Sequence, residues 1–202
     1  MSEKNVWDIL NRNLFFIKNA VEKREVKTSD KLDVYDPESR QIILECREPD
    51  IGVLTKTARF FGGKHDKGTK FNLVANIPTS KEQVLRIVRG NTTFKFGGAA
   101  INIYDQWNSL LGKLKRKHLT FEMEFVFLPE KLGDTFVLQI KNHEILCNGK
   151  TVAAFEKHNT DFFKDNKFDY AFSINQEVPA NSQMRQALLA LAFTQHRTLN
   201  MV

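Results

Sequence analysis

The sequence contains little cysteine and no apolar run long enough to cross a bilayer. Cys46 and Cys147 are the two cysteines among 202 residues, and two cysteines cannot supply the disulfide framework of a small secreted domain. The opening segment, MSEKNVWDILNRN, has no apolar stretch that would direct export. We therefore expect a cytoplasmic protein whose thiols stay reduced.

Motifs of the common enzyme classes are also missing. The sequence has neither a GxSxG elbow nor an HExxH pair, and its five histidines lack zinc spacing. Residues 63–70, GKHDKGTK, imitate a phosphate-binding loop, but they end in Thr-Lys where Lys-Ser or Lys-Thr is needed. A strand-like segment, FNLVANI, follows where a helix would be required. We predict a protein without catalytic activity and without a resident cofactor.

What the sequence does contain describes one ordered domain with a basic surface. Seventeen Phe and a hydrophobic content of 42% are typical of a chain with a packed core. A length of 202 residues suits one mainly β domain. The 30 basic against 24 acidic residues give a net charge of +6, which favours anionic partners such as lipid or nucleic acid.

Apolar side chains alternate with polar ones along most of the chain, which predicts antiparallel strands. Ile42, Leu44 and Cys46 should share one face of a hairpin whose turn falls at Asp36-Pro37. Asn148-Gly149 predicts a type I′ turn, because both residues tolerate positive φ angles. Other period-two runs contain Phe121, Met123, Phe125 and Phe127; Phe136, Leu138 and Ile140; and Phe168, Tyr170, Phe172 and Ile174. Residues 51–61 have apolar spacing that suits a short helix.

The C-terminal segment differs from the rest of the chain. Pro179 suits the start of a helix, Asn181 or Ser182 could cap it, and ALLALAF at 187–193 contains no polar side chain. Successive helical positions are 100° apart, so this run is apolar on every side. A bilayer span needs about 20 apolar residues, and charged residues flank this shorter run. We predict a helix at about 180–197 that is buried inside the sheet.

Three segments resemble the phospholipid scramblase and LURP-one-related families of the Tubby-like superfold. They are LDVYDPESRQIILEC, INIYDQWNSLLGKLKRK and FDYAFSINQEVPANSQMRQALLALAFTQHRT. The resemblance implies a mainly β fold: a closed antiparallel β-barrel of about a dozen strands around the apolar C-terminal helix. We expect a helical lead-in at 1–12 and the barrel domain at 13–202.

Basic residues are most concentrated in the segment 113–117. The candidate lipid-binding residues are Lys113, Lys115, Arg116 and Lys117, with Arg86, Arg89 and Lys95 as secondary candidates. Alternation places Lys113, Lys115 and Lys117 on one face of a strand. Tubby-like proteins bind phosphoinositide head groups through cationic side chains, so the resemblance implies a non-catalytic lipid-binding or scramblase-like module.

Such a module would be a monomer that associates peripherally with anionic phospholipid at the inner membrane face. Several alternatives stay open. The charges could instead keep a sheet edge hydrated and unpaired. The protein could also be a protein-interaction scaffold or a nucleic-acid-associated regulator, although no aromatic-interleaved motif supports nucleic acid.

A calcium site is a further expectation that the resemblance raises. Scramblases carry an acidic segment before the terminal helix, and here that place holds Asp161, Asp165, Asn166 and Asp169. Calcium requires six to eight oxygen ligands. Lys164 and Lys167 interrupt this segment and no glycine forms the bend, so a hydrated hairpin is the competing interpretation.

Overall fold

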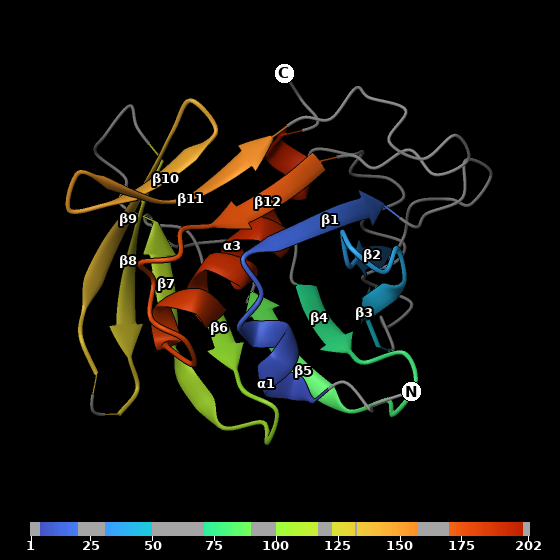
Figure 1. Cartoon of the computed structure of the whole chain (residues 1–202). Coiled ribbons are helices and arrows are strands. Elements are labelled where there is room, and N and C mark those ends of the chain that lie inside the picture. Colours follow the sequence, from blue (N-terminus) through green and yellow to red (C-terminus); the bar gives the residue numbers. More distant parts are fainter. Residues whose placement is uncertain are drawn as a thin grey trace, which may run out of the picture.

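The computed structural model describes residues 5–19, 31–49, 71–89, 100–116, 123–131, 133–156 and 170–199. Within them, twelve antiparallel strands close into one barrel, and a C-terminal helix runs through its interior (Figure 1). The predicted fold class is therefore confirmed. The helices are α1 (Val6–Leu10) and α3 (Gln183–Leu199). The strands are β1 (Leu14–Asn19), β2 (Lys31–Tyr35), β3 (Ile42–Arg47), β4 (Phe71–Asn76), β5 (Gln83–Arg89), β6 (Ile101–Tyr104), β7 (Leu110–Arg116), β8 (Met123–Pro129), β9 (Phe136–Lys141), β10 (Glu144–Cys147), β11 (Lys150–Glu156) and β12 (Tyr170–Ile174).

The barrel is an up-and-down meander closed by its first and last strands. Each strand pairs with its neighbours in the sequence, and β1 pairs with both β2 and β12. Phe15 lies opposite Phe172 across the closing seam. Closure gives every strand two partners, so the barrel has no unpaired edge of the kind that promotes aggregation.

The interior of the barrel is filled by α3, as the apolar run predicted. Every residue of the run 187–193 is at most 1% exposed. The helix begins at Gln183 and ends at Leu199, so it starts later than the expected position 180. Ser182 caps it, because its Oγ accepts a hydrogen bond from the backbone N–H of Arg185 at 3.3 Å. Pro179 lies four residues before the first helical residue, in the segment that joins β12 to α3, so its predicted place at the helix start is wrong.

A buried arginine joins α3 to the N-terminal segment. Arg185 is 3% exposed. Its Nη1 donates to the carbonyl oxygens of Leu10 at 3.2 Å and Arg12 at 2.8 Å. Its Nε donates to the carbonyl of Val178 at 3.3 Å, and its Nη2 donates to Oδ1 of Asn13. We call these contacts the Arg185 clasp. None of the four acceptors is a carboxylate, and burial lowers the pKa of Arg185.

The strand patterns predict most inward positions correctly. The buried side chains of the period-two runs include Phe125, Phe127, Leu138, Ile140, Tyr170, Phe172 and Ile174. Asn148 and Gly149 have φ angles of 51° and 76°, as a type I′ turn between β10 and β11 requires. The segments at 51–61, 121 and 168 lie outside the described residues.

One side chain of the first predicted hairpin faces the opposite way. Val34 pairs with Leu44, but Tyr35 pairs with Ile42, so a bulge shifts the register between them. A one-residue shift moves a side chain to the other face of a sheet. Ile42 therefore does not share the inward face of Leu44 and Cys46, and it packs instead against an outer cluster that contains Phe16 and Tyr35.

Gly112 of β7 has a steric reason to be glycine. A Cβ atom there would lie 2.5 Å from the ring of Phe127 and 2.6 Å from the carbonyl oxygen of Leu128. The Phe127 ring stacks on Phe136 with a centroid separation of 4.6 Å. The stacked rings of Phe127 and Phe136 thus fill the space on the inner side of β7 at Gly112, and Lys113 and Lys115 lie on the outer side.

Candidate functional site

The outer surface of β5 and β7 carries a group of cations that we call the basic face. It consists of Arg86, Lys113 and Lys115 on the outer side of these strands, together with the exposed Arg116 at the end of β7. Gly112 and Leu114 are buried on the inner side of β7, so alternation turns Lys113 and Lys115 outward. Strands β5 and β7 both pair with β6, which separates them by about 10 Å. Four of the seven predicted lipid-binding residues therefore lie on this part of the barrel surface.

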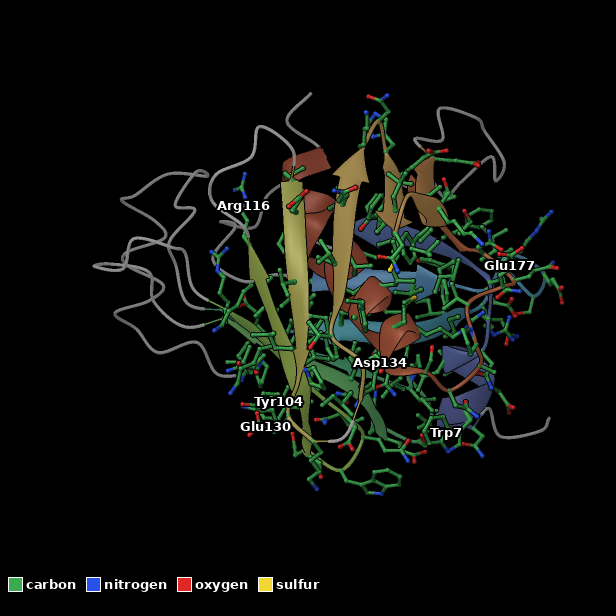
Figure 2. The ribbon with its side chains drawn as sticks, turned by 90° about the vertical axis from the view of Figure 1, so that its left-hand side faces the viewer. Trp7, Tyr104, Arg116, Glu130, Asp134 and Glu177 are labelled. Atoms are coloured by element: carbon green, nitrogen blue, oxygen red, sulfur yellow. The ribbon has the colours of Figure 1, made fainter. Side chains whose placement is uncertain are left out.

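The two cations at the end of β7 are the most accessible members of the basic face. Lys115 and Arg116 are both exposed, and no ion pair joins either one to a described residue. Arg116 has the inward phase of Leu114, but it is the last residue of the strand and extends into solvent. Figure 2 shows it at the upper edge of this face, at the opposite end from Tyr104.

Lys113 is partly neutralised by an acidic neighbour. Its Nζ lies 3.2 Å from Oε2 of Glu130, and the two side chains are 39% and 43% exposed. Exposed pairs of this kind contribute little to stability and exchange partners readily. Lys113 is therefore a weaker member of the basic face than Lys115.

Among the described residues, the groups that hold Arg86 in place are neutral. Its Nε donates to Oδ1 of Asn72 at 2.9 Å, and its Nη1 donates to Oδ1 of Asn108 at 3.4 Å. The guanidinium carbon lies 5.6 Å from the centre of the Tyr104 ring, a cation–π distance. These contacts orient Arg86 without cancelling its charge.

The remaining predicted residues do not join the basic face. Arg89 ends β5 with the phase of the inward-facing Leu85 and Ile87 and is only partly exposed. Lys95 and Lys117 lie outside the described residues. So do the four candidate calcium ligands Asp161, Asp165, Asn166 and Asp169.

Neither a metal cluster nor a reactive thiol is found in the described ranges. No three His, Cys, Asp or Glu side chains among the described residues are grouped so that they could hold a metal ion. Cys46 and Cys147 are buried and unbridged. Burial raises the pKa of both thiols, so they stay protonated and poorly nucleophilic at neutral pH.

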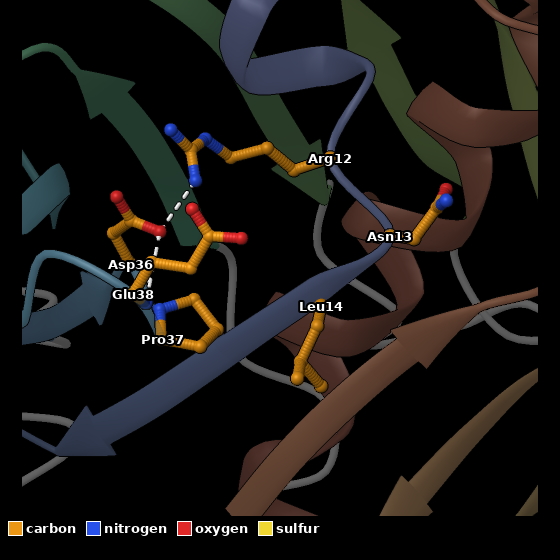
Figure 3. A pocket seen from close by; sticks show the side chains of 6 residues that line it. All are labelled: Arg12, Asn13, Leu14, Asp36, Pro37 and Glu38. Carbon is orange, nitrogen blue, oxygen red and sulfur yellow. Dashed lines mark hydrogen bonds and ion pairs between the residues drawn. The ribbon is translucent and has the colours of Figure 1, made fainter.

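A pocket of about 370 Å³ lies between the start of β1 and the β2–β3 turn (Figure 3). Arg12 Nη1 donates to Oδ1 of Asp36 at 2.5 Å, and Ser39 Oγ donates to Oδ2 of Asp36 at 2.6 Å. Leu14, Pro37 and Glu38 complete part of its wall. The ion pair between Arg12 and Asp36 therefore joins the start of β1 to the β2–β3 turn.

Sequence reasoning missed two neighbours that shape the basic face. Glu130 reaches Lys113 only through the β7–β8 register, in which Gly112 lies opposite Pro129. Tyr104 reaches Arg86 through the β5–β6 register, where the two residues are direct partners. The alternation of INIY marked Tyr104 as outward-facing, and that pattern was the available signal.

Comparisons with protein-family models, with curated proteins and with solved structures find no match to this chain. None of the helices in the described ranges has the length and apolar character needed to span a membrane. The basic face is therefore the feature on which a functional proposal can be based.

Proposed function

We propose that this protein is a non-catalytic module that associates peripherally with anionic membranes through the basic face. The observation that carries the proposal is the exposure of Lys115 and Arg116 without an ion pair to any described residue, on a strand that also presents Lys113. Arg86 adds a charge whose described contacts are all neutral. Phosphate and carboxylate head groups are the natural partners of such cations.

The charge of the basic face fits reversible binding. A basic side chain near an anionic leaflet contributes about 1 kcal/mol. Arg86, Lys115 and Arg116 would together contribute about 3 kcal/mol, with less from Lys113 because Glu130 competes for it. That free energy corresponds to weak, salt-sensitive attachment.

The sequence resemblance supports the same class of ligand. The chain resembles scramblase and LURP-one-related proteins, and Tubby-like proteins bind phosphoinositide head groups through cations. A head group with several phosphates would engage Lys115 and Arg116 together better than a single carboxylate does. The buried, unbridged Cys46 and Cys147 fit a reducing compartment, so we assign the contact to the cytoplasmic leaflet.

Vesicle sedimentation tests the proposal. The purified chain is mixed with phosphatidylcholine vesicles that contain phosphatidylserine, a phosphoinositide or neither, at ~0.1 M and ~1 M salt, where the Debye length falls from about 10 Å to about 3 Å. We expect binding only to the anionic vesicles and mostly at low salt. Lys115→Gln/Arg116→Gln should weaken binding about thirtyfold, the equivalent of two charges at about 1 kcal/mol each.

A matched control removes equal charge from elsewhere on the barrel. Arg40 and Lys150 are exposed, on the β2–β3 turn and on β11, away from β7. Arg40 has φ of 58°, which asparagine tolerates, so the control is Arg40→Asn/Lys150→Gln. Equal weakening by both double variants would show that only net charge matters and would remove the basic face from the proposal. Binding that is independent of anionic lipid would reject the function itself.

A further inference from the structure

The hairpin between β6 and β7 presents an indole to solvent. Trp107 is 70% exposed, whereas the other large apolar side chain classed as exposed among the described residues, Leu14, is 39% exposed. A Trp side chain carries the largest apolar area of any residue, so leaving it in water has a substantial free-energy cost. Nothing in the described fold gains from this placement.

The conformation of the turn does not depend on the indole. Oδ1 of Asp105 accepts hydrogen bonds from the backbone N–H groups of Trp107 at 2.9 Å and Ser109 at 2.8 Å. The backbone N–H of Asp105 donates to the carbonyl of Ser109 at 3.0 Å, and that of Asn108 donates to the carbonyl of Asp105 at 3.1 Å. Asp105 thus closes the turn through hydrogen bonds that its own carboxylate accepts.

Strand β5 braces the same turn from the side. Gln83 Nε2 donates to the carbonyl of Asp105 at 2.6 Å and to Oδ1 of Asn108 at 3.2 Å. Arg86 Nη1 also donates to Oδ1 of Asn108, at 3.4 Å. A turn fixed in this way loses little conformational entropy when its tip binds a partner. The indole is therefore presented on a preorganised support.

The surroundings of the tip combine an aromatic group with a cation. Arg86 lies over the Tyr104 ring at 5.6 Å and contacts Asn108 of the turn. Figure 2 shows Tyr104 at the end of the face near Glu130. Trp and Tyr rings are enriched where a bilayer meets water, because the ring is apolar and its N–H or O–H stays hydrated. A basic side chain beside them meets the lipid phosphates.

We propose that the β6–β7 turn is a membrane anchor in which Trp107 enters the interfacial layer of an anionic bilayer while Arg86 contacts lipid phosphates. The inference rests on the proposed function and adds a hydrophobic contact to it. Trp107 and Arg116 lie near opposite ends of β7, whose seven residues span about 20 Å. Both reach a flat bilayer together when β7 lies along its surface.

Fluorescence of a single-tryptophan chain tests the anchor. The protein has two Trp residues, and Trp7 packs against the core, so Trp7→Phe leaves Trp107 as the sole indole. This variant is mixed with vesicles of phosphatidylcholine and phosphatidylserine, with and without brominated acyl chains. We expect a blue-shifted emission on binding and strong quenching by the brominated lipid.

Sedimentation of Trp107→Ala with the same vesicles gives the second measurement. Partial burial of one large apolar side chain should be lost, so binding should weaken about tenfold. Trp107→Phe should recover part of the lost binding. Leu14→Ala, on the far side of the barrel from β7, is the matched control and should bind like the unchanged chain. Denaturant unfolding should be unaltered in Trp107→Ala, because the indole is exposed.

The outcomes separate the anchor from the proposed function. Binding to anionic vesicles with unshifted, unquenched Trp107 emission and normal binding of Trp107→Ala would overturn the anchor and leave the basic face in place. Absence of binding to any anionic vesicle would overturn both. Quenching together with the weakened binding of Trp107→Ala supports the anchor.

Discussion

Arginine and lysine side chains occupy two contrasting environments in this barrel. Arg185 is inside, 3% exposed, with its described donors engaged by carbonyl and amide oxygens. Lys115 and Arg116 are outside, exposed and without an ion pair to a described residue. Arg185 joins the terminal helix to the start of the chain, whereas Lys115 and Arg116 join no two described elements.

The comparison distinguishes charged residues that stabilise the fold from charged residues that can bind a ligand. A buried cation must have its hydrogen bonds satisfied, since an unpaired buried charge is very costly. An exposed cation has water as a partner and can exchange it for a ligand at little cost. Substitutions inside the barrel should therefore change stability, and those on the basic face should change binding alone.

The largest expected effect comes from removing the Arg185 clasp. Arg185→Met keeps the apolar stem but leaves the buried carbonyl of Leu10 and the partly buried carbonyl of Arg12 without this donor. We expect the free energy of unfolding to fall by about 3 to 5 kcal/mol, measured by urea denaturation. Arg185→Lys keeps the charge without the planar fork and should recover only part of the loss. A loss below ~1 kcal/mol for the methionine variant would show that the clasp is not structural.

A smaller loss is expected on the inner side of β7. Gly112→Ala would place a Cβ atom 2.5 Å from the Phe127 ring, and overpacking of this kind costs about 1 to 3 kcal/mol. Lys113→Ala, one residue along on the outer side, should change the unfolding free energy by less than ~0.5 kcal/mol. Equal effects of the two variants in thermal unfolding would contradict the inside–outside contrast.

A single buried hydroxyl gives the next effect in size. Tyr170 donates to the carbonyl oxygen of Ala192 at 2.9 Å and so joins β12 to α3. Tyr170→Phe should cost about 1 kcal/mol, the net value of one buried hydrogen bond. Tyr104→Phe, on the outer face, is the control and should leave the denaturation midpoint unchanged. If both tyrosine variants have the same denaturation midpoint, the Tyr170 hydroxyl does not stabilise the contact between β12 and α3.

Much of this architecture could be predicted from local sequence patterns. The alternation that turns Lys113 and Lys115 outward and the all-apolar run of α3 are both local signals, and the structure has them as expected. The bulge at Ile42 was missed, because a register shift inverts the phase that alternation assumes. A pattern of period two carries no information about where such a shift falls.

Contacts between residues far apart in the sequence could not be predicted, for a different reason. Arg185 finds its acceptors at Leu10 and Arg12, more than 170 residues earlier in the chain. The pairing of Lys113 with Glu130 depends on the β7–β8 register. Both contacts exist only once the barrel has closed. The sequence could therefore identify charged residues as candidates for binding, but it could not tell those that stabilise the fold from those that are free to contact a ligand.

The smallest stability effect belongs to the basic face and is the sharpest test of the contrast. Lys115→Gln/Arg116→Gln removes two exposed cations that make no ion pair with a described residue, so the unfolding free energy should change by less than ~0.5 kcal/mol. The same variant should lose about thirtyfold in binding to anionic vesicles. Urea denaturation and vesicle sedimentation on one preparation measure both quantities. A loss of stability comparable to that of Arg185→Met would mean that these cations hold the barrel together, and the binding loss would then be a consequence of unfolding.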